Sequence, residues 1–348
     1  LMEMNVEKNT CCKFIMVQVT ENANDKKNTG YKNICEIGKE RIRRKIVKVL
    51  VLGGNGFIGS NLSKKLRDLG HSVISFDLNE PDIQCEGVTY IAGNFFDDNE
   101  IIPYLKGIDV VYHAISTINP GNSNLKYMQG YQLDFIQSVK LCDWAKKYNF
   151  RIIYLSSGGS VYGRQVIMPI EEERCSIPIN HYGNLKLCVE NTFRTFNCQF
   201  GTDIIIARIA NPYGPGQDYS KGVGFIDAVL KRGLNKEVVE IWGDGSIIRD
   251  YIYIEDVCNM LGFLLDYQGV EKVFNISSGV GTSQNEILEI VRSLLPELSV
   301  SYLPARSVDV DDIILDNSKI LSVFEEKILS VKKGIEKYYD FLLNEKEK

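Results

Sequence analysis

The feature that most constrains the fold is the stretch Ile46–Ser60, which reads IVKVLVLGGNGFIGS. The apolar, β-branched run Ile46–Leu52 predicts a buried parallel strand, and the chain then continues as an amphipathic helix. Between the two, Gly53, Gly56 and Gly59 recur at three-residue spacing. Glycines so placed allow a tight turn, a close approach of the backbone to a pyrophosphate at the helix N-terminus, and close packing of helix on strand. The stretch therefore predicts a dinucleotide-binding unit, with a purely structural glycine-rich loop as the alternative.

The residues after this turn indicate which dinucleotide is bound. The helix, Phe57–Gly70, is followed by a second apolar strand, Ser72–Phe76, and then by Asp77. A carboxylate about twenty residues past the glycines can bind the adenosine ribose hydroxyls, and it repels a 2′-phosphate. Asn79 is neutral, and no arginine follows directly. We therefore expect NAD(H) rather than NADP(H) as the cofactor.

The composition excludes several classes of protein. With 44% hydrophobic and 24% charged residues, the 348-residue chain resembles ordinary globular proteins with a sizeable core. Its net charge of −5 leaves no general basic surface for nucleic acid, and no apolar run is long enough for a membrane span. Nine cysteines occur without a C-x-x-C pair or a zinc-type spacing, so we expect buried free thiols and no metal. No signal-peptide pattern opens the chain, and we expect a cytoplasmic protein.

The chain is expected to contain three parts. Residues 1–45, rich in Asn and Lys, predict an N-terminal extension, residues 46–213 an NAD-binding domain, and residues 214–348 mainly a substrate-binding domain. Alternating strands and helices predict an α/β fold, a Rossmann-type doubly wound parallel sheet with a smaller C-terminal α/β substrate domain. Strands are expected at Val88–Ile91, Val110–His113, Arg151–Ser156 and Asp203–Ile209, helices at about Leu125–Tyr148 and His181–Phe200, and short C-terminal strands near Val238–Trp242, Tyr251–Ile254, Val273–Ile276 and Val300–Leu303.

A second motif, YGNLK, places Tyr182 and Lys186 four residues apart. On a helix such residues share a face, so the ammonium can lie near the phenol and near a cofactor ribose. A nearby cation favours the phenolate and lowers the tyrosine pKa, which makes a usable base near neutral pH. The spacing alone is common on surface helices. Here it opens the helix that follows a strand of the predicted NAD-binding fold.

With these motifs in view, the chain resembles the extended short-chain dehydrogenase/reductase superfamily, specifically nucleotide-sugar epimerases of the UDP-galactose (UDP-glucose) 4-epimerase type. The resemblance spans roughly residues 48–339. It rests on five ordered motifs: GGNGFIGS, SSGGSVYG, YGNLK, RIANPYGPGQ and WGDGSIIRDYIYIEDV. Motifs in this order are specific for the superfamily and much less specific for one substrate.

The resemblance implies a role for each matching residue. Tyr182 is the expected base, and Lys186 is expected to hold the nicotinamide ribose. The expected cofactor-binding set is Gly53, Gly56, Phe57, Ile58, Gly59, Asp77, Asn94, Phe95, Ala114, Ser156, Tyr182 and Lys186. The expected substrate-binding set is Asn211, Trp242, Arg249, Arg306 and Ile313, in which the arginines contact the diphosphate. Surface ion pairs are the alternative for the arginines, and packing in the core is the alternative for Ile313.

Two departures from the family pattern concern the catalytic residues. The family has Ser or Thr where this chain has Gly158, and we expect the neighbouring Ser157 to act in its place, with Ser160 or a water molecule as alternatives. The family asparagine in the preceding helix is Asp134 here. The catalytic set implied by the resemblance is therefore Tyr182, Lys186 and Ser157.

The resemblance leaves a choice among reactions. Gly159 and Ser160 replace the acidic pair of sugar-nucleotide dehydratases, which disfavours dehydration. We expect NAD-dependent 4-epimerisation of a UDP-hexose or UDP-N-acetylhexosamine through a transient 4-keto sugar. The alternatives are an NAD(P)H-dependent reductase of a nucleotide-linked 4-keto-6-deoxysugar and a non-catalytic cofactor-binding protein. The resemblance also implies a homodimer formed by the two long helices.

Overall fold

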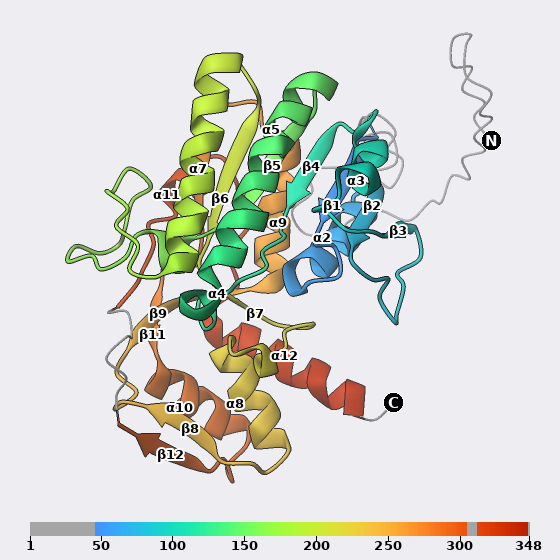
Figure 1. Ribbon diagram of the computed structural model, residues 1–348. Helices are drawn as coiled ribbons and strands as arrows, with labels where there is room; N and C mark the ends of the chain where they lie inside the picture. Colours follow the sequence, from blue (N-terminus) through green and yellow to red (C-terminus); the bar gives the residue numbers. More distant parts are fainter. Residues whose placement is uncertain (1–45, 305–311, 347–348) are drawn as a thin grey trace, which may run out of the picture. The chain divides into compact units, whose positions relative to one another are not determined.

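The structure, a computed structural model, describes residues 46–304 and 312–346, and residues 47–348 group into one compact unit. Its main element is a parallel seven-stranded sheet (Figure 1). The strand order reverses between β1 and β4, the kind of switch point at which ligands bind in doubly wound folds. The predicted α/β class is confirmed. From edge to edge the strands are β10 (Val273–Ile276), β6 (Ile204–Ile209), β5 (Arg151–Ser157), β4 (Val110–His113), β1 (Lys48–Leu52), β2 (Ser72–Asp77) and β3 (Val88–Ala92).

Both faces of this sheet are buried by helices. Along β1, Val49 and Val51 pack into one hydrophobic cluster while Leu50 and Leu52 pack into another, as the two-residue period of a strand requires. The first cluster lies under α2 (Phe57–Asp68) and α9 (Ile254–Asp266), and the second lies under α3 (Asp98–Leu105), α5 (Ile136–Tyr148) and α7 (His181–Phe200).

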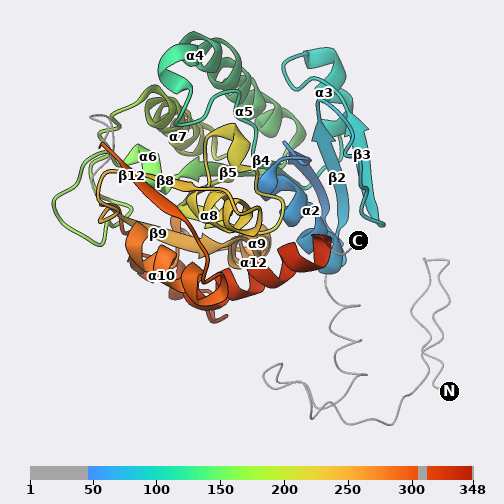
Figure 2. The same cartoon turned by 90° about the horizontal axis from the view of Figure 1, so that it is seen from below.

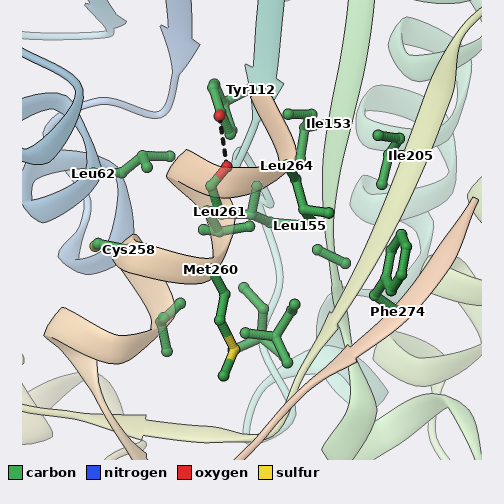
Figure 3. Close-up of a cluster of buried hydrophobic side chains, with 14 of the residues drawn as sticks. Leu62, Tyr112, Ile153, Leu155, Ile205, Cys258, Met260, Leu261, Leu264 and Phe274 are labelled. Atoms are coloured by element: carbon green, nitrogen blue, oxygen red, sulfur yellow. Dashed lines mark hydrogen bonds between the residues drawn. The ribbon is translucent and has the colours of Figure 1, made fainter. Parts of the chain in front are cut away.

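Helix α9 is joined to the sheet by apolar packing and by one polar contact. Figure 3 shows Leu261, Leu264 and Met260 of α9 among the side chains of β5, β6 and β10. The Tyr112 hydroxyl of β4 donates a hydrogen bond to the Leu261 carbonyl over 2.8 Å. A fully buried tyrosine thus keeps its polar atom satisfied.

The long helix expected over Leu125–Tyr148 is interrupted. The chain forms α4 (Ser123–Gln129), a π-helical turn η2 (Gly130–Phe135) and then α5. A Cβ on Gly130 would lie 2.6 Å from Ile118 Cδ1, so the chain approaches its neighbours more closely here than a side chain would allow. Such π-helical turns change the directions in which side chains point, and they occur frequently at functional sites.

The C-terminal third forms two small sheets and contains a third hydrophobic cluster. It lies below the large sheet in Figure 1, and Figure 2 shows the molecule from that side. The Ser283–Glu286 capping box expected at the start of one helix is present. No helix within the described ranges combines the length and apolar character that a bilayer span needs. The elements are β7 (Asn211–Tyr213), β9 (Ile248–Tyr253) and β11 (Gly281–Ser283) in one sheet, β8 (Val239–Trp242) and β12 (Val300–Leu303) in the other, and the helices α8 (Phe225–Leu234), α10 (Gln284–Leu294) and α12 (Val331–Lys346), with short turns α6 (Gly158–Val161), η3 (Tyr219–Lys221) and α11 (Ser318–Leu321).

Strand β10 differs from the expectation that it belongs to the smaller C-terminal part. It pairs in parallel with β6 and forms one edge of the large sheet, with Val273 opposite Ile206. Its residues Phe274 and Ile276 are fully buried. Because α9 crosses the sheet face before β10 begins, residues beyond 214 contribute to the large sheet as well as to the small ones.

Candidate active site

A glycine-lined turn joins β1 to α2 at the carboxyl end of the sheet. A Cβ on Gly59 would lie 2.1 Å from the Gly53 carbonyl oxygen, and one on Gly54 would lie 2.1 Å from Ser75 Oγ. Helix α2 and strand β2 therefore approach this turn closely only because both residues lack side chains. A Cβ on Gly56 would meet only the Gly53 carbonyl oxygen, at 3.2 Å, and would otherwise enter open space. The turn therefore leaves room for a ligand to contact the backbone directly.

The carboxylate of Asp77 lies against this turn. Its Oδ2 accepts a hydrogen bond from the Asn55 amide at 3.0 Å, and its Oδ1 accepts one from the Leu78 amide at 2.8 Å. Phe57 and Ile58 form the first turn of α2, whose N-terminus carries no acidic residue. A pyrophosphate is favoured at such a helix N-terminus, and a ribose diol is favoured beside the carboxylate. These residues fit NAD, which they would hold by its pyrophosphate and adenosine ribose.

Asn94, Phe95 and Ala114 follow the neighbouring strands at the same end of the sheet. The Asn94 side chain accepts a hydrogen bond from the Phe96 amide at 3.0 Å, and the Phe95 ring is buried against the Phe96 ring. The carbonyl carbon of Ala114 lies 3.2 Å from the Cβ that Gly53 would carry. The loop after β4 thus adjoins the glycine-lined turn at Gly53.

Helix α7 brings the predicted catalytic pair to the end of β5. Asn180 caps the helix by accepting a hydrogen bond from the Gly183 amide at 2.8 Å. Lys186 Nζ donates to the Leu155 carbonyl at 2.9 Å and lies 5.7 Å from the centre of the Tyr182 ring. The lysine is buried, so its ammonium is held in place by the strand on which the reaction centre is built.

The electrostatics of this pair differ from the expectation in one respect. Burial raises the pKa of Tyr182 to about 12, the Asp134 carboxylate adds to this effect, and hydrogen bonding with the Ser157 side chain acts in the opposite direction. Burial also lowers the pKa of Lys186 to about 8. The group that favours the Tyr182 phenolate here is Ser157 and not the Lys186 ammonium, which is directed at the Leu155 carbonyl.

The absence of a side chain at Gly158 has a direct structural cause. A Cβ at this position would lie 2.3 Å from Cδ1 of the fully buried Leu315, and 3.2 Å from the Arg208 carbonyl oxygen. Leu315 therefore occupies the space that a serine or threonine would need. Ser157, one residue earlier, is the side chain that lowers the pKa of Tyr182, and its catalytic role stays a prediction.

Asn211 and Arg249 lie on the adjacent strands β7 and β9. Asn211 Nδ2 donates to the Asp250 carbonyl at 3.0 Å, and its Oδ1 lies 3.6 Å from the Cβ that Gly159 would carry. Arg249 Nη1 donates to the Ile248 carbonyl at 2.9 Å. The small sheet thus places Asn211 beside the short helix that follows β5.

Of the other expected substrate-binding residues, Trp242 is exposed and Ile313 is buried. Trp242 ends β8, opposite Leu303 of β12, and 37% of its surface is exposed. Ile313 donates its amide to the Ile248 carbonyl at 3.2 Å, and its side chain is 1% exposed within the first hydrophobic cluster. This packing favours a structural role for Ile313. Arg306 lies outside the described residues.

A buried ion pair behind the catalytic helix was missed in the sequence. Glu190 Oε2 accepts from Arg208 Nη2 at 2.6 Å, and its Oε1 accepts from the Ser156 hydroxyl at 2.5 Å. The Ser156 hydroxyl is therefore directed at the ion pair. The available signals were a carboxylate one helical turn beyond Lys186 and a lone arginine in an apolar strand. The network ties α7 to β5 and β6 and so fixes the turn that carries Lys186.

A cavity of about 410 Å³ lies on the far side of this ion pair, away from Tyr182. It is lined by residues that precede α7, by one face of α7 and by the β10 edge. Both lysines of its lining are already paired, since Lys319 contacts Glu173 and Glu271, and Lys272 contacts Asp203. The cavity therefore contains no unpaired lysine that could act on Tyr182 and Lys186.

Comparison with known proteins identifies the family of this chain. A model of the NAD dependent epimerase/dehydratase family matches residues 49–277. The UDP-glucose 4-epimerase of Halalkalibacterium halodurans is 29% identical over 311 residues, which cover 83% of this chain and 93% of that protein. The dTDP-4-dehydro-6-deoxyglucose reductase of Escherichia coli is 29% identical over 290 residues, covering 79% and 90%. The UDP-glucose 4-epimerase of Thermotoga maritima, solved with UDP-glucose, is 30% identical with a TM-score of 0.80, covering 86% of this chain and 99% of that one. The chain therefore belongs to the NAD dependent epimerase/dehydratase family and is an NAD-dependent epimerase of the extended short-chain dehydrogenase/reductase type.

Proposed function

We propose that this protein is a nucleotide-sugar 4-epimerase in which Tyr182 is the catalytic base. The observation that carries the proposal is the placement of Tyr182 and Lys186 on helix α7, with the Lys186 ammonium bonded to the Leu155 carbonyl of β5, at the sheet end that also bears the glycine-lined turn. The substrate class is supported by relatives that are UDP-glucose 4-epimerases. We propose UDP-hexoses or UDP-N-acetylhexosamines as substrates.

Each catalytic side chain has one task in this mechanism. Bound NAD supplies the acceptor for a hydride from carbon 4 of the sugar and holds that hydride for return. Tyr182 takes the proton of the 4-hydroxyl as the hydride leaves, which produces a 4-keto sugar. Ser157 donates a hydrogen bond that stabilises the phenolate, and Lys186 holds the nicotinamide ribose. After the 4-keto sugar has rotated, Tyr182 would return the proton to the oxygen on carbon 4, and bound NAD would be regenerated in each turnover.

The substrate is held by the C-terminal third of the chain. Arg249 and Arg306 bind the diphosphate, because guanidinium groups present several donors to phosphate oxygens and a net acidic protein needs such cations locally. Asn211 contacts the same region from β7. The exposed ring of Trp242 lies against the nucleotide base.

Two other reactions of related enzymes are less well supported. Dehydration needs an acid/base pair where this chain has Gly159 and Ser160. Reduction of a 4-keto-6-deoxysugar would use the same base, and one relative is such a reductase. One solved structure that is 30% identical and covers 86% of the chain with a TM-score of 0.80 is a UDP-glucose 4-epimerase, which favours epimerisation.

The test is incubation of the purified protein, without added cofactor, with a panel of UDP-, dTDP- and GDP-sugars that includes N-acetylhexosamines. NMR of the products should show the 4-epimer of at least one UDP-sugar. Tyr182→Phe should retain NAD while turnover falls by a factor of about 10² to 10⁴, the usual contribution of a general base. Product formed only from a 4-keto-6-deoxysugar with stoichiometric NAD(P)H would replace the proposal with the reductase.

We also propose that the protein is a cytoplasmic homodimer. Apolar side chains are exposed along α4, η2 and α5, with Leu125 88% and Ile136 49% exposed, and Phe200 at the end of α7 is 47% exposed. A two-fold pairing of these helices would bury them. The cytoplasmic location is supported by free thiols at every cysteine within the described ranges, namely Cys85, Cys142, Cys175, Cys188, Cys198 and Cys258.

A further inference from the structure

A buried carboxylate lies in the π-helical turn next to the catalytic helix. Asp134 of η2 is 4% exposed, and its Oδ2 accepts hydrogen bonds from Ser116 Oγ at 3.0 Å and from the Thr117 amide at 2.8 Å. Its Oδ1 is buried and has no hydrogen-bond partner among the described residues, and no salt bridge reaches the carboxylate there. Both hydrogen bonds to this carboxylate therefore come from uncharged donors, a hydroxyl and a backbone amide.

This charge acts on both members of the catalytic pair. The turn η2 packs directly against α7, which carries Tyr182 and Lys186. Burial is the main cause of the raised pKa of Tyr182, and the Asp134 carboxylate raises it further. In Lys186 burial lowers the pKa, and the Asp134 carboxylate opposes that effect. In each case the anion favours the protonated form, as expected for a charge in a poorly solvated site.

We propose that Asp134 sets the pH range in which the active site works. The proposal rests on the proposed role of Tyr182 as the base. Activity then requires Tyr182 to lose its proton and Lys186 to keep its own. Because one carboxylate favours protonation of both groups, it moves the acid and alkaline limbs of the pH-rate profile in the same direction, toward higher pH. A neutral residue at this position would shift the whole profile toward lower pH.

The other groups around the pair do not account for such a shift. Burial lowers the pKa of His113 to about 3, so this imidazole stays neutral in the working range. Glu190, which is paired with Arg208, raises the pKa of Lys186 less than Asp134 does and is not among the groups that act on Tyr182. His181 remains a competing group, since it precedes Tyr182 and its Nδ1 lies 3.2 Å from a tyrosine hydroxyl of η2. The titratable groups that surround the pair are His113 of β4, Tyr154 of β5, Tyr131 of η2, and His181, Cys188 and Glu190 of α7.

The test is Asp134→Asn, which keeps an oxygen to accept both hydrogen bonds and removes the charge. We expect both apparent pKa values of kcat/KM to fall by about one unit, the lower end of the effect of a charge within a few ångströms. A second measurement does not depend on turnover. In protein labelled with ¹³Cζ-tyrosine, the NMR titration midpoint of Tyr182, assigned by its loss in Tyr182→Phe, should fall by a similar amount.

Three further variants make the outcome specific. Asp227→Asn removes another fully buried carboxylate, one bonded to the Tyr338 hydroxyl in the C-terminal part, and should leave both midpoints unchanged. In a His181→Asn background the shift caused by Asp134→Asn should persist. If Asp134→Asn does not fold, Asp134→Ser must move the midpoints in the same direction.

Two results separate this inference from the proposed function. Reduced turnover with unchanged midpoints in both measurements would overturn the inference, because it would mean that Asp134 has a structural role alone. A Tyr182→Phe enzyme that retains full turnover would overturn the proposed base. In that case the NMR midpoint of Tyr182 would still report whether Asp134 acts on it.

Discussion

Leu315 and Gly158 should behave as one packed unit, and this can be measured by a double-mutant cycle. Gly158→Ala would place its methyl group 2.3 Å from Leu315 Cδ1, whereas carbon atoms in contact lie about 3.5–4.0 Å apart. The Arg208 carbonyl, 3.2 Å from the same Cβ, and the Ile209 carbonyl, at 3.4 Å, limit movement on the other side. Leu315 itself is fully buried and has little room to withdraw.

The expected magnitudes follow from this geometry. Overpacking a buried site costs about 1–3 kcal/mol, so we expect Gly158→Ala to lower the free energy of unfolding by about 2 kcal/mol. Leu315→Ala alone should cost about 3 kcal/mol, within the range for buried leucines. In the double variant the new methyl enters the space that the leucine leaves. The combined loss should therefore be smaller than the sum by about 1–2 kcal/mol.

The assay is urea unfolding of the four proteins followed by circular dichroism. Gly159→Ala is the matched control, because its Cβ would lie 3.6 Å from the Asn211 side chain, an ordinary contact, in the same short helix. This control should change stability by less than about 1 kcal/mol, the size of the helix-propensity difference between Gly and Ala. Strict additivity of the two substitutions would refute the claim that Leu315 fills the space at Gly158.

Three other predictions concern the cofactor, the buried ion pair and assembly. Asp77→Ala should narrow the preference for NAD(H) over NADP(H) measured by calorimetry, and tighter NADP(H) binding by the unmodified protein would contradict the assignment. Glu190→Gln should lower the free energy of unfolding by about 3–5 kcal/mol in chemical denaturation, because it leaves Arg208 buried without its partner. As a control, Arg194→Ala, at the exposed side of this ion pair, should cost less than about 1 kcal/mol. Sedimentation at micromolar concentration should show a dimer that Leu125→Glu dissociates, and a 39.4 kDa species alone in the unmodified protein would count against the dimer.

Much of the fold follows from local patterns in the sequence. The first two strands, the glycine-lined turn and helix α7 lie close to where the apolar runs and the glycines predict them. The reason is that a strand, a helix start or a tight turn depends mainly on residues a few positions apart. The YGNLK spacing likewise places Tyr182 and Lys186 on one helix regardless of what packs around them.

Other features depend on residues that are distant in the sequence. The pairing of β10 with β6, the interruption of the long helix at Gly130, and the Glu190–Arg208 pair arise only when separate elements pack together. The same holds for the catalytic residues themselves. Leu315 lies more than 150 positions from Gly158, and its side chain occupies the space that a side chain at residue 158 would need.

The sequence by itself therefore determined the parallel sheet, the dinucleotide turn and the position of the Tyr182–Lys186 pair, because each is a local pattern. Only the tertiary structure decided the electrostatic setting of that pair. Burial and the Asp134 charge act on Tyr182 and Lys186 through space, across elements whose contact no sequence spacing encodes. Protonation in an active site depends on the arrangement of all nearby charges and on solvent access, and both exist only in the folded chain.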